Sequence, residues 1–424
     1  MATEKGRRFV KYLKSRFKSH KPGPGHEAAG LFSTLPPELF EIVTWYLKTA
    51  DNSSFRLTCR YIEACTFRYW TKFCLESIQT DLSERSYRSL KKLLKEPRLV
   101  PMVKKFTVKE TNFSGLGKGF KWKRTQFDRR LVVPQPTIQE WLNIVRALPN
   151  ARSFAICRPV TAFDANEYKL ITASDAVTVI LAIIIGLRRP LDSFTLDFTP
   201  QHRNPIDLTR LNRQDFLDPG FLMAWNKLES LSVRVKLDNP AVGDYVFWMF
   251  HEMPNLRRLS FNFEDGKEGS WFMHHVAANS MECKFPLEEL RLEKIHFESA
   301  DVIAGVLRNN KRTLKKLEIV SCSLPHGWWV ELLRWIGDNC PALESITLHC
   351  LKERGEKKGY VHFPAVSETT VADAGGVRFV YHSRRWPVVD RRAPMRNFYI
   401  SYQGPKMGTA ITKLIEWAEY IRTP

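Results

Sequence analysis

One spacing of apolar residues recurs along most of this 424-residue chain and limits what it can fold into. An apolar residue is followed by two arbitrary residues, a second apolar residue, one arbitrary residue and a third apolar residue. Six clear copies begin at residues 191, 228, 256, 287, 314 and 343, and two degenerate copies begin at 103 and 151. Such alternation is typical of a strand with one buried face. Helical patterns separate the copies, so the sequence predicts one strand and one helix in each unit.

A strand and a helix at a nearly constant period predict a solenoid, in which each unit buries its apolar face against its neighbours. The alternative is an ordinary α/β domain with a parallel sheet, whose strands tend to be continuously apolar instead. The unit resembles the consensus of leucine-rich repeats, and Cys322 matches the Asn/Cys position of that consensus. The resemblance implies an irregular leucine-rich-repeat-like α/β solenoid over residues 76–350.

The stretch from residue 35 to residue 70 has apolar residues at the three- and four-residue steps of short helices. Pro36 and Pro37 suit a helix start, and residues 49–54 predict a polar break between helices. The stretch resembles the F-box family, and in particular the F-box proteins of filamentous fungi. The matching positions are the opening Leu35-Pro36-x-Glu38-Leu39, the segment Leu57-Thr58-Cys59-Arg60, and the closing Trp70.

This second resemblance implies an all-α F-box-like unit over residues 31–75. Such a unit binds a Skp-type adaptor and, through it, a cullin-based ubiquitin ligase. The residues that we expect to contact the adaptor are Leu35, Pro36, Leu39, Ile42, Leu47, Leu57, Cys59 and Tyr61. The alternative is an amphipathic helical hairpin without a special role, which the periodicity alone does not exclude.

The inner face of the predicted solenoid is the second candidate site. Strand alternation places the residues between the apolar positions on the exposed face of the sheet. The residues that we expect to contact a protein substrate are Arg234, Arg258, Asn262, Arg291, Glu293, Lys316 and Glu318. The alternative is that these opposite charges simply pair across neighbouring strands.

The net charge of +20 and the pI of 9.6 suit acidic partners, nucleic acid or anionic surfaces. Residues 1–30 are predicted to be a basic, mostly disordered tail, with nuclear import, an anionic membrane or a mitochondrial presequence as alternatives. An inserted basic loop, residues 114–130, is rich in glycine. Phe120 and Trp122 could stack on single-stranded nucleic acid, but we expect a mobile surface loop.

Other features limit the class of protein. The eight cysteines have no CxxC pair, which indicates reduced thiols and a location in the nucleus, the cytoplasm or both. The longest near-apolar run, 176–187, is too short to cross a bilayer. No catalytic, cofactor-binding or metal-binding spacing stands out, so we expect neither an enzyme nor a cofactor. Residues 351–424 are predicted to form a loop and a C-terminal capping segment.

Two functions remain. The sequence favours a substrate-recognition subunit of an SCF-type (Skp–cullin–F-box) ubiquitin ligase, in which the repeat domain binds a protein substrate. The alternative is a basic, nucleic-acid-associated or scaffolding repeat protein without a ligase role.

Overall fold

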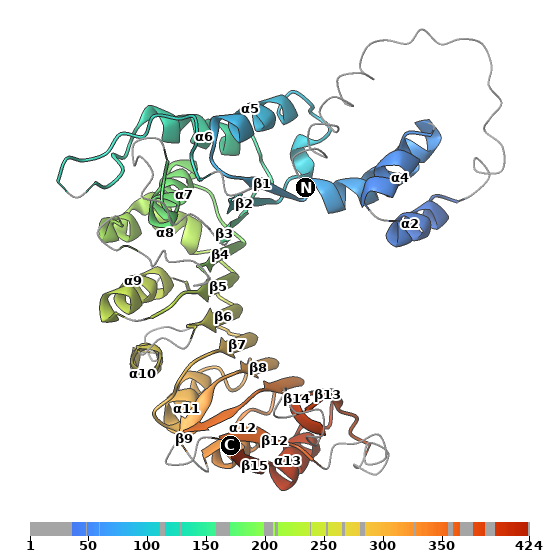
Figure 1. Cartoon of the computed structure of the whole chain (residues 1–424), viewed down its shortest axis with the longest axis vertical. Helices are drawn as coiled ribbons and strands as arrows, with labels where there is room; N and C mark the ends of the chain where they lie inside the picture. The colour runs from blue at the N-terminus through green and yellow to red at the C-terminus, as the bar shows by residue number, and fades with distance from the viewer. Residues whose placement is uncertain are drawn as a thin grey trace.

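Among the residues that it describes, the computed structural model has three helices near the N-terminus and a long sheet that is covered by further helices (Figure 1). It describes residues 36–47, 49–58, 60–110, 115–127, 129–157, 170–198, 207, 211–237, 239–251, 253–264, 268–279, 285–325, 328–354, 359–364, 376–385 and 395–422. The basic tail lies outside the described residues. The chain has the mixed α/β architecture that the sequence predicted, with a large and mostly parallel sheet.

The N-terminal helices are α2 (Pro37–Tyr46), α3 (Thr49–Arg56) and α4 (Arg60–Cys74). Pro37 is the first residue of α2, where its missing N–H removes no helical hydrogen bond. The prediction of a polar break at residues 49–54 is wrong, because these residues form most of α3. Asn52 and Arg56 are buried there, so tertiary packing outweighs the low helix propensity of this polar segment.

Within the described residues, the main sheet contains eleven strands. In spatial order they are β1 (Ser77–Thr80), β2 (Lys105–Lys109), β3 (Ser153–Cys157), β4 (Ser193–Asp197), β5 (Ser230–Arg234), β6 (Arg258–Asn262), β7 (Glu289–Glu293), β8 (Lys316–Val320), β10 (Ser345–His349), β14 (Met395–Gln403) and β13 (Val380–Arg385). The first nine pair in parallel with their neighbours, in chain order. Strand β1 escaped prediction because it contains a single apolar residue, Ile78.

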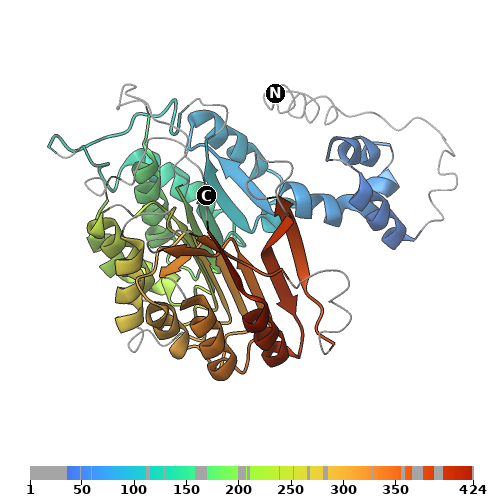
Figure 2. The same ribbon diagram turned by 60° about the horizontal axis from the view of Figure 1, so that its bottom comes forward.

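Helices cover one side of the sheet, as Figure 1 shows for α6 to α10. They are α5 (Glu84–Leu93), α6 (Pro136–Arg146), α7 (Ala173–Leu187), α8 (Pro219–Trp225), α9 (Pro240–His251), α10 (Gly269–Asn279), α11 (Ala300–Arg308), α12 (Trp328–Asn339) and α13 (Met407–Trp417), with short 3-10 helices at Val100–Met102 and Arg213–Leu217. Figure 2 shows α2 and α3 set apart from the sheet, with α4 leading into β1.

The core follows the repeat. All three apolar positions of the eight predicted copies are buried, none more than 4% exposed. Because the strands pair in register, equivalent positions are adjacent: Leu231 lies beside Leu259, and Leu259 beside Leu290. Burial of a leucine side chain contributes about 1.5–3 kcal/mol relative to an exposed one. The prediction of a strand at each copy is therefore confirmed.

The glycine-rich loop packs against residues of α5, α6 and α7. Leu116 and Trp122 are buried in the core, and the Trp122 indole N–H donates to the carbonyl oxygen of Gly117 at 2.9 Å. A side chain at Gly117, which has a φ of 75°, would lie 2.6 Å from that indole. The prediction of a surface loop is wrong for this part, because its apolar residues belong to the core. Base stacking on Trp122 is excluded for the same reason.

The C-terminal end of the parallel run is an antiparallel pair. Strand β14 pairs with β10, and β13 pairs with β14. Helix α13 ends at Trp417, and residues 419–422 then pair with β12. A second sheet has the order β15 (Glu419–Arg422), β12 (Gly359–His362), β11 (Lys352–Arg354) and β9 (Ser323–Pro325). Strands β11 and β12 replace part of a predicted loop.

An ion pair buried on both sides ties the glycine-rich loop to α7. The side chains of Arg124 and Asp175 are 3% and 0% exposed. The Arg124 guanidinium donates to both carboxylate oxygens, at 3.1 and 2.7 Å. Asp175 also accepts from the backbone N–H of Thr172 at 2.8 Å, which completes a capping box at the start of α7.

We expect Arg124→Ala to lower the free energy of unfolding by about 3–5 kcal/mol, because it strands the Asp175 carboxylate in the core. Urea denaturation checks this, with Lys123→Ala as the control because the neighbouring Lys123 side chain is exposed. A variant within about 0.5 kcal/mol of the control would show that the ion pair has no structural role.

Asp215, in the 3-10 helix before α8, gives the fold a pH dependence. Burial, together with the charge of Asp218, raises the pKa of Asp215 from 3.8 to about 6, although a hydrogen bond from Asn212 opposes the shift. Burial also raises the pKa of the neighbouring Tyr245 hydroxyl. The folded chain therefore binds the Asp215 proton more tightly than the unfolded chain does.

Because the folded-state pKa is the higher one, this contribution to stability falls as pH rises from about 4 to about 6. We expect Asp215→Asn to remove it, so that the variant gains about 1–2 kcal/mol relative to the native chain between pH 4 and pH 7. Urea denaturation of both chains at pH 4 and pH 7 measures the difference in unfolding free energy between variant and native chain. The same difference at both pH values would contradict the raised pKa of Asp215.

Candidate functional site: a charged sheet face and an apolar helical face

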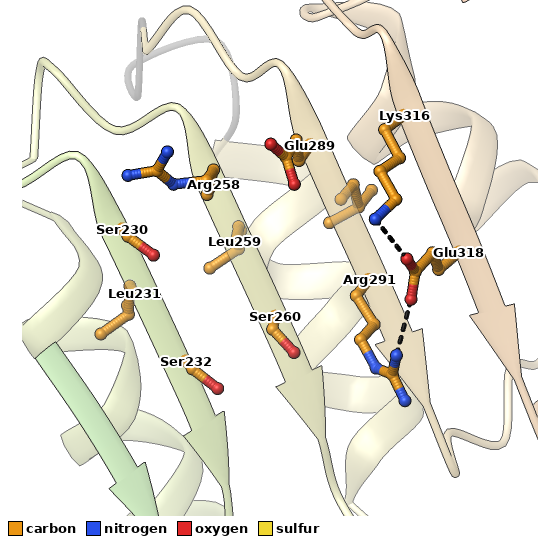
Figure 3. A pocket seen from close by; sticks show the side chains of 11 residues that line it. Ser230, Leu231, Ser232, Arg258, Leu259, Ser260, Glu289, Arg291, Lys316 and Glu318 are labelled. Carbon is orange, nitrogen blue, oxygen red and sulfur yellow. Dashed lines mark hydrogen bonds and ion pairs between the residues drawn. The ribbon is translucent and has the colours of Figure 1, made fainter. Parts of the chain in front are cut away.

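The exposed side of β5 to β8 forms a pocket with a volume of about 270 Å³ (Figure 3). Strands β5 and β6 contribute three short hydroxyl side chains, those of Ser230, Ser232 and Ser260. Strands β6, β7 and β8 contribute five charged side chains: Arg258, Glu289, Arg291, Lys316 and Glu318. The pocket is therefore uncharged at one end and carries both signs of charge at the other.

The structure brings four of the seven predicted substrate residues to this pocket: Arg258, Arg291, Lys316 and Glu318. Glu293 and Arg234 are near the ends of their strands, outside it. The prediction that Asn262 is exposed is wrong, because this residue is only 3% exposed. Its side-chain oxygen accepts a hydrogen bond from the backbone N–H of Glu264 at 3.1 Å, so it holds the turn after β6.

Ion pairs join the charged residues across the strands. Arg291 donates to Glu293 at 2.7 Å and to Glu318 at 2.6 Å, and Lys316 lies 2.7 Å from Glu318. Partial burial alone would raise the pKa of Glu318, but its hydrogen bond and charge interaction with Lys316, and the charge of Arg291, lower it. Burial likewise opposes the hydrogen bonds that raise the pKa of Arg291. Here the alternative of mutual charge pairing describes the geometry well.

Arg234 is also surrounded by carboxylates, but less closely. Its guanidinium nitrogens lie 3.8 Å from Asp197, 4.0 Å from Glu264 and 3.9 Å from Glu293. Arg258 differs from both arginines. It is half exposed, and the carboxylate paired with it, that of Glu229, is 3.8 Å away and equally exposed. Arg258 is therefore the pocket cation whose charge is most available to a ligand.

A small aromatic core holds the N-terminal helices together. Phe40 of α2 is 1% exposed and packs against Phe55 and Tyr61, with ring centroids 6.3 and 5.8 Å apart. The Arg56 guanidinium lies 4.1 Å from the centre of the Trp70 ring, in cation–π geometry. Trp70, predicted as the closing residue of the stretch, thus contacts α3 as well as its own helix.

The same helices expose apolar side chains. Among the predicted adaptor residues, Leu39, Ile42 and Tyr61 are 42%, 55% and 39% exposed. Pro36 is exposed as well, and Leu47 and Leu57 are half-buried. Leu35 and Cys59 lie outside the described residues.

The sequence reasoning missed a further exposed group on these helices. Trp45, Tyr46 and Phe73 are 68%, 82% and 59% exposed. The Trp45 ring contacts those of Tyr69 and Phe73, at centroid distances of 6.1 and 6.3 Å. The helical period of α2 could have placed Trp45 and Ile42 on one face, three residues apart. This face of α2 and α4 differs from an ordinary protein surface because several large apolar side chains lie next to one another on it.

The cysteines fit packing better than metal binding. No group of three metal-ligating side chains occurs among the described residues. Cys322 is fully buried, and its thiol donates to the carbonyl oxygens of Leu292 and Val320, at 3.4 and 3.5 Å. Burial raises the pKa of Cys340 to about 11, which keeps this thiol protonated at neutral pH.

Comparison with known proteins gives no match: no protein-family model and no curated protein matches this chain. Among the helices that the structure describes, none is long and apolar enough to span a bilayer.

The two exposed arginines of the pocket should respond differently to charge reversal. Arg291→Glu places a carboxylate beside Glu293 and Glu318, so we expect a loss of about 1–2 kcal/mol of unfolding free energy. Arg258→Glu should change the stability by less than about 0.5 kcal/mol, because its pairing is loose and exposed. Urea denaturation of both variants tests the assignment, and equal losses would contradict it.

Proposed function

We propose that the chain is the substrate-recognition subunit of an SCF-type ubiquitin ligase. In this proposal the α2–α4 unit binds a Skp-type adaptor and, through it, a cullin, while the pocket of the sheet binds a protein substrate. The chain itself has no catalytic role, and it works in the nucleus, the cytoplasm or both.

The observation that carries the proposal is the exposed apolar face of α2. Leu39 and Ile42 belong to the segment that resembles the F-box opening, and both are about half exposed while Phe40 between them is buried. A folded helical unit usually turns such residues inward. Their outward direction fits an apolar partner surface, which the adaptor would supply.

The repeat architecture supports the second half of the proposal. The eight repeat strands pair in register, and the helices pack on the face of the sheet that is opposite to the pocket. This arrangement is expected of leucine-rich repeats. Buried Cys322 bonds to backbone carbonyls after its strand, as the Asn/Cys position of that repeat would. The pocket on β5 to β8 then provides a recognition surface that is built from different residues than the adaptor face.

Capture of a purified Skp-type adaptor by the full-length chain tests the docking step. We expect Leu39→Asp with Ile42→Asp to abolish capture, because two carboxylates would be desolvated against an apolar surface. The matched control is Leu217→Asp with Met223→Asp, which adds the same charge at apolar residues that are 66% and 50% exposed elsewhere. It should bind the adaptor like the native chain.

Undiminished capture by the first variant, with an unchanged melting temperature, would refute the F-box assignment. Arg258→Glu separates the two halves of the proposal. It should retain the adaptor and cullin in a co-purification but change the other proteins that are recovered. If it keeps every partner, the substrate surface is not this pocket.

A further inference from the structure

The described part of the glycine-rich loop ends in a hairpin that the proposed ligase role does not use. Residues 123–127 and 129–132 form two short antiparallel arms: the backbone N–H of Thr125 donates to the carbonyl of Arg130 at 2.9 Å, and that of Val132 donates to the carbonyl of Lys123 at 3.0 Å. In Figure 1 this teal segment projects past α6, away from the strands. Phe127, at the tip, is 99% exposed.

The base of this hairpin is firmly held. Arg124 makes the buried ion pair with Asp175, and the Gln135 side chain bonds to both the N–H and the carbonyl of Lys123, at 3.0 and 3.3 Å. Trp122 is buried just before it. Because these groups are fixed inward, the alternate residues Lys121 and Lys123 face solvent. The exposed tip therefore stands on an ordered base.

The charge around the hairpin is strongly positive. Residues 84–130 contain 15 Lys and Arg against 4 Asp and Glu, a net +11 out of the chain's +20. The loop lies against α5: the carbonyl of Lys118 accepts from the N–H of Glu84 at 2.9 Å, and Phe120 contacts Tyr87 at a centroid distance of 5.8 Å. The exposed cations of α5 are Arg85, Arg88, Lys91 and Lys92. Helix α5 thus lies beside residues 118–120, and these residues lead into the hairpin; we call the exposed cations of α5, of residues 118–123 and of the hairpin the basic surface.

We propose that this surface binds single-stranded nucleic acid, with a base stacked on Phe127 and the phosphate backbone on the cations of the hairpin and α5. Exposed aromatic rings beside fixed cations are what single strands require, since every base has a face that can stack. This site differs from the stacking site that the sequence suggested, because Trp122 is buried. It does not depend on the ligase role.

The neighbours of Phe127 favour nucleic acid over an anionic membrane. Thr125 and Gln126 are exposed beside it. Insertion of a single ring would bring these polar groups to an anionic lipid surface, which costs free energy. Against a single strand, the Gln126 amide can bond to a base edge instead. A single apolar residue at the tip is also little for membrane anchoring.

Fluorescence anisotropy with labelled oligo(dT) and oligo(U) of about 15 nucleotides tests the proposal on the full chain. We expect affinity that falls steeply between about 50 and 200 mM salt. Phe127→Ala should weaken binding about 5- to 100-fold, and Phe127→Trp should restore it. Met223→Ala, at another exposed apolar residue, is the control and should have no effect. Binding of either oligonucleotide supports the proposal, and the comparison tells DNA from RNA.

Lys121→Glu with Lys123→Glu should weaken binding about tenfold or more and reduce the salt slope by about one to two. Three results would overturn the proposal. These are no binding of either oligonucleotide at low salt, equal binding by Phe127→Ala and the native chain, or Phe127-dependent binding to phosphatidylserine vesicles without binding to oligonucleotides. None of them bears on adaptor capture, so the ligase proposal is tested separately.

Discussion

The in-register parallel ladder is the constraint on which the rest of the structure depends. Because each strand pairs with the next without a shift, chemically equivalent positions form continuous rows across the sheet. A single residue of slippage would move Leu259 to the exposed face and Arg258 into the core. The core and the polar face are therefore fixed together. The helices can vary in length and sequence as long as each covers the apolar residues of the strands next to it.

The same rows explain the inner face. Side chains that point away from the helices are also brought side by side, so charges of opposite sign on neighbouring strands pair wherever the sequence supplies both. Arg291, Glu318 and Lys316 form a series of ion pairs of this kind. Because these charges are already paired, they are less available to bind a ligand. Recognition then depends on the positions where the pairing is incomplete. Arg258 is one, and the hydroxyl of Ser230 lies beside it on the neighbouring strand.

The sequence predicted the strands, which depend on the local spacing of apolar residues. It predicted little of the structure that depends on contacts between distant parts of the chain. All eight predicted repeat strands are present, since the spacing of buried residues is local information. Residues 49–54 could not be recognised as helical because their helix is stabilised by packing on α4, not by propensity. The burial of Asn262 depends on a turn after its strand. Trp122 stands in a basic, glycine-rich context typical of surface loops, and only the fold shows that it is buried in the core.

The exposed face of α2 was predicted in part, and Trp45 and Phe73 were missed because a contact between helices α2 and α4 brings them together.

Most of the chain's excess positive charge lies at the N-terminal end of the sheet, and its position there is informative. Leu116 and Trp122 of the glycine-rich loop are buried in the core at this end of the chain. Their packing fixes which residues point inward but places no demand on the sign of the charges that point outward. Along the middle strands, by contrast, most cations have a carboxylate across the next strand. Within residues 84–130 the fold needs Arg124 for its buried ion pair with Asp175. The remaining excess of positive charge in this segment opposes compaction through mutual repulsion. Such a charge is best understood as a property of association. Phe127 is almost fully exposed at the tip of the hairpin. Charge attraction alone would not require an aromatic ring there, and the ring adds a flat apolar contact to the binding of a partner.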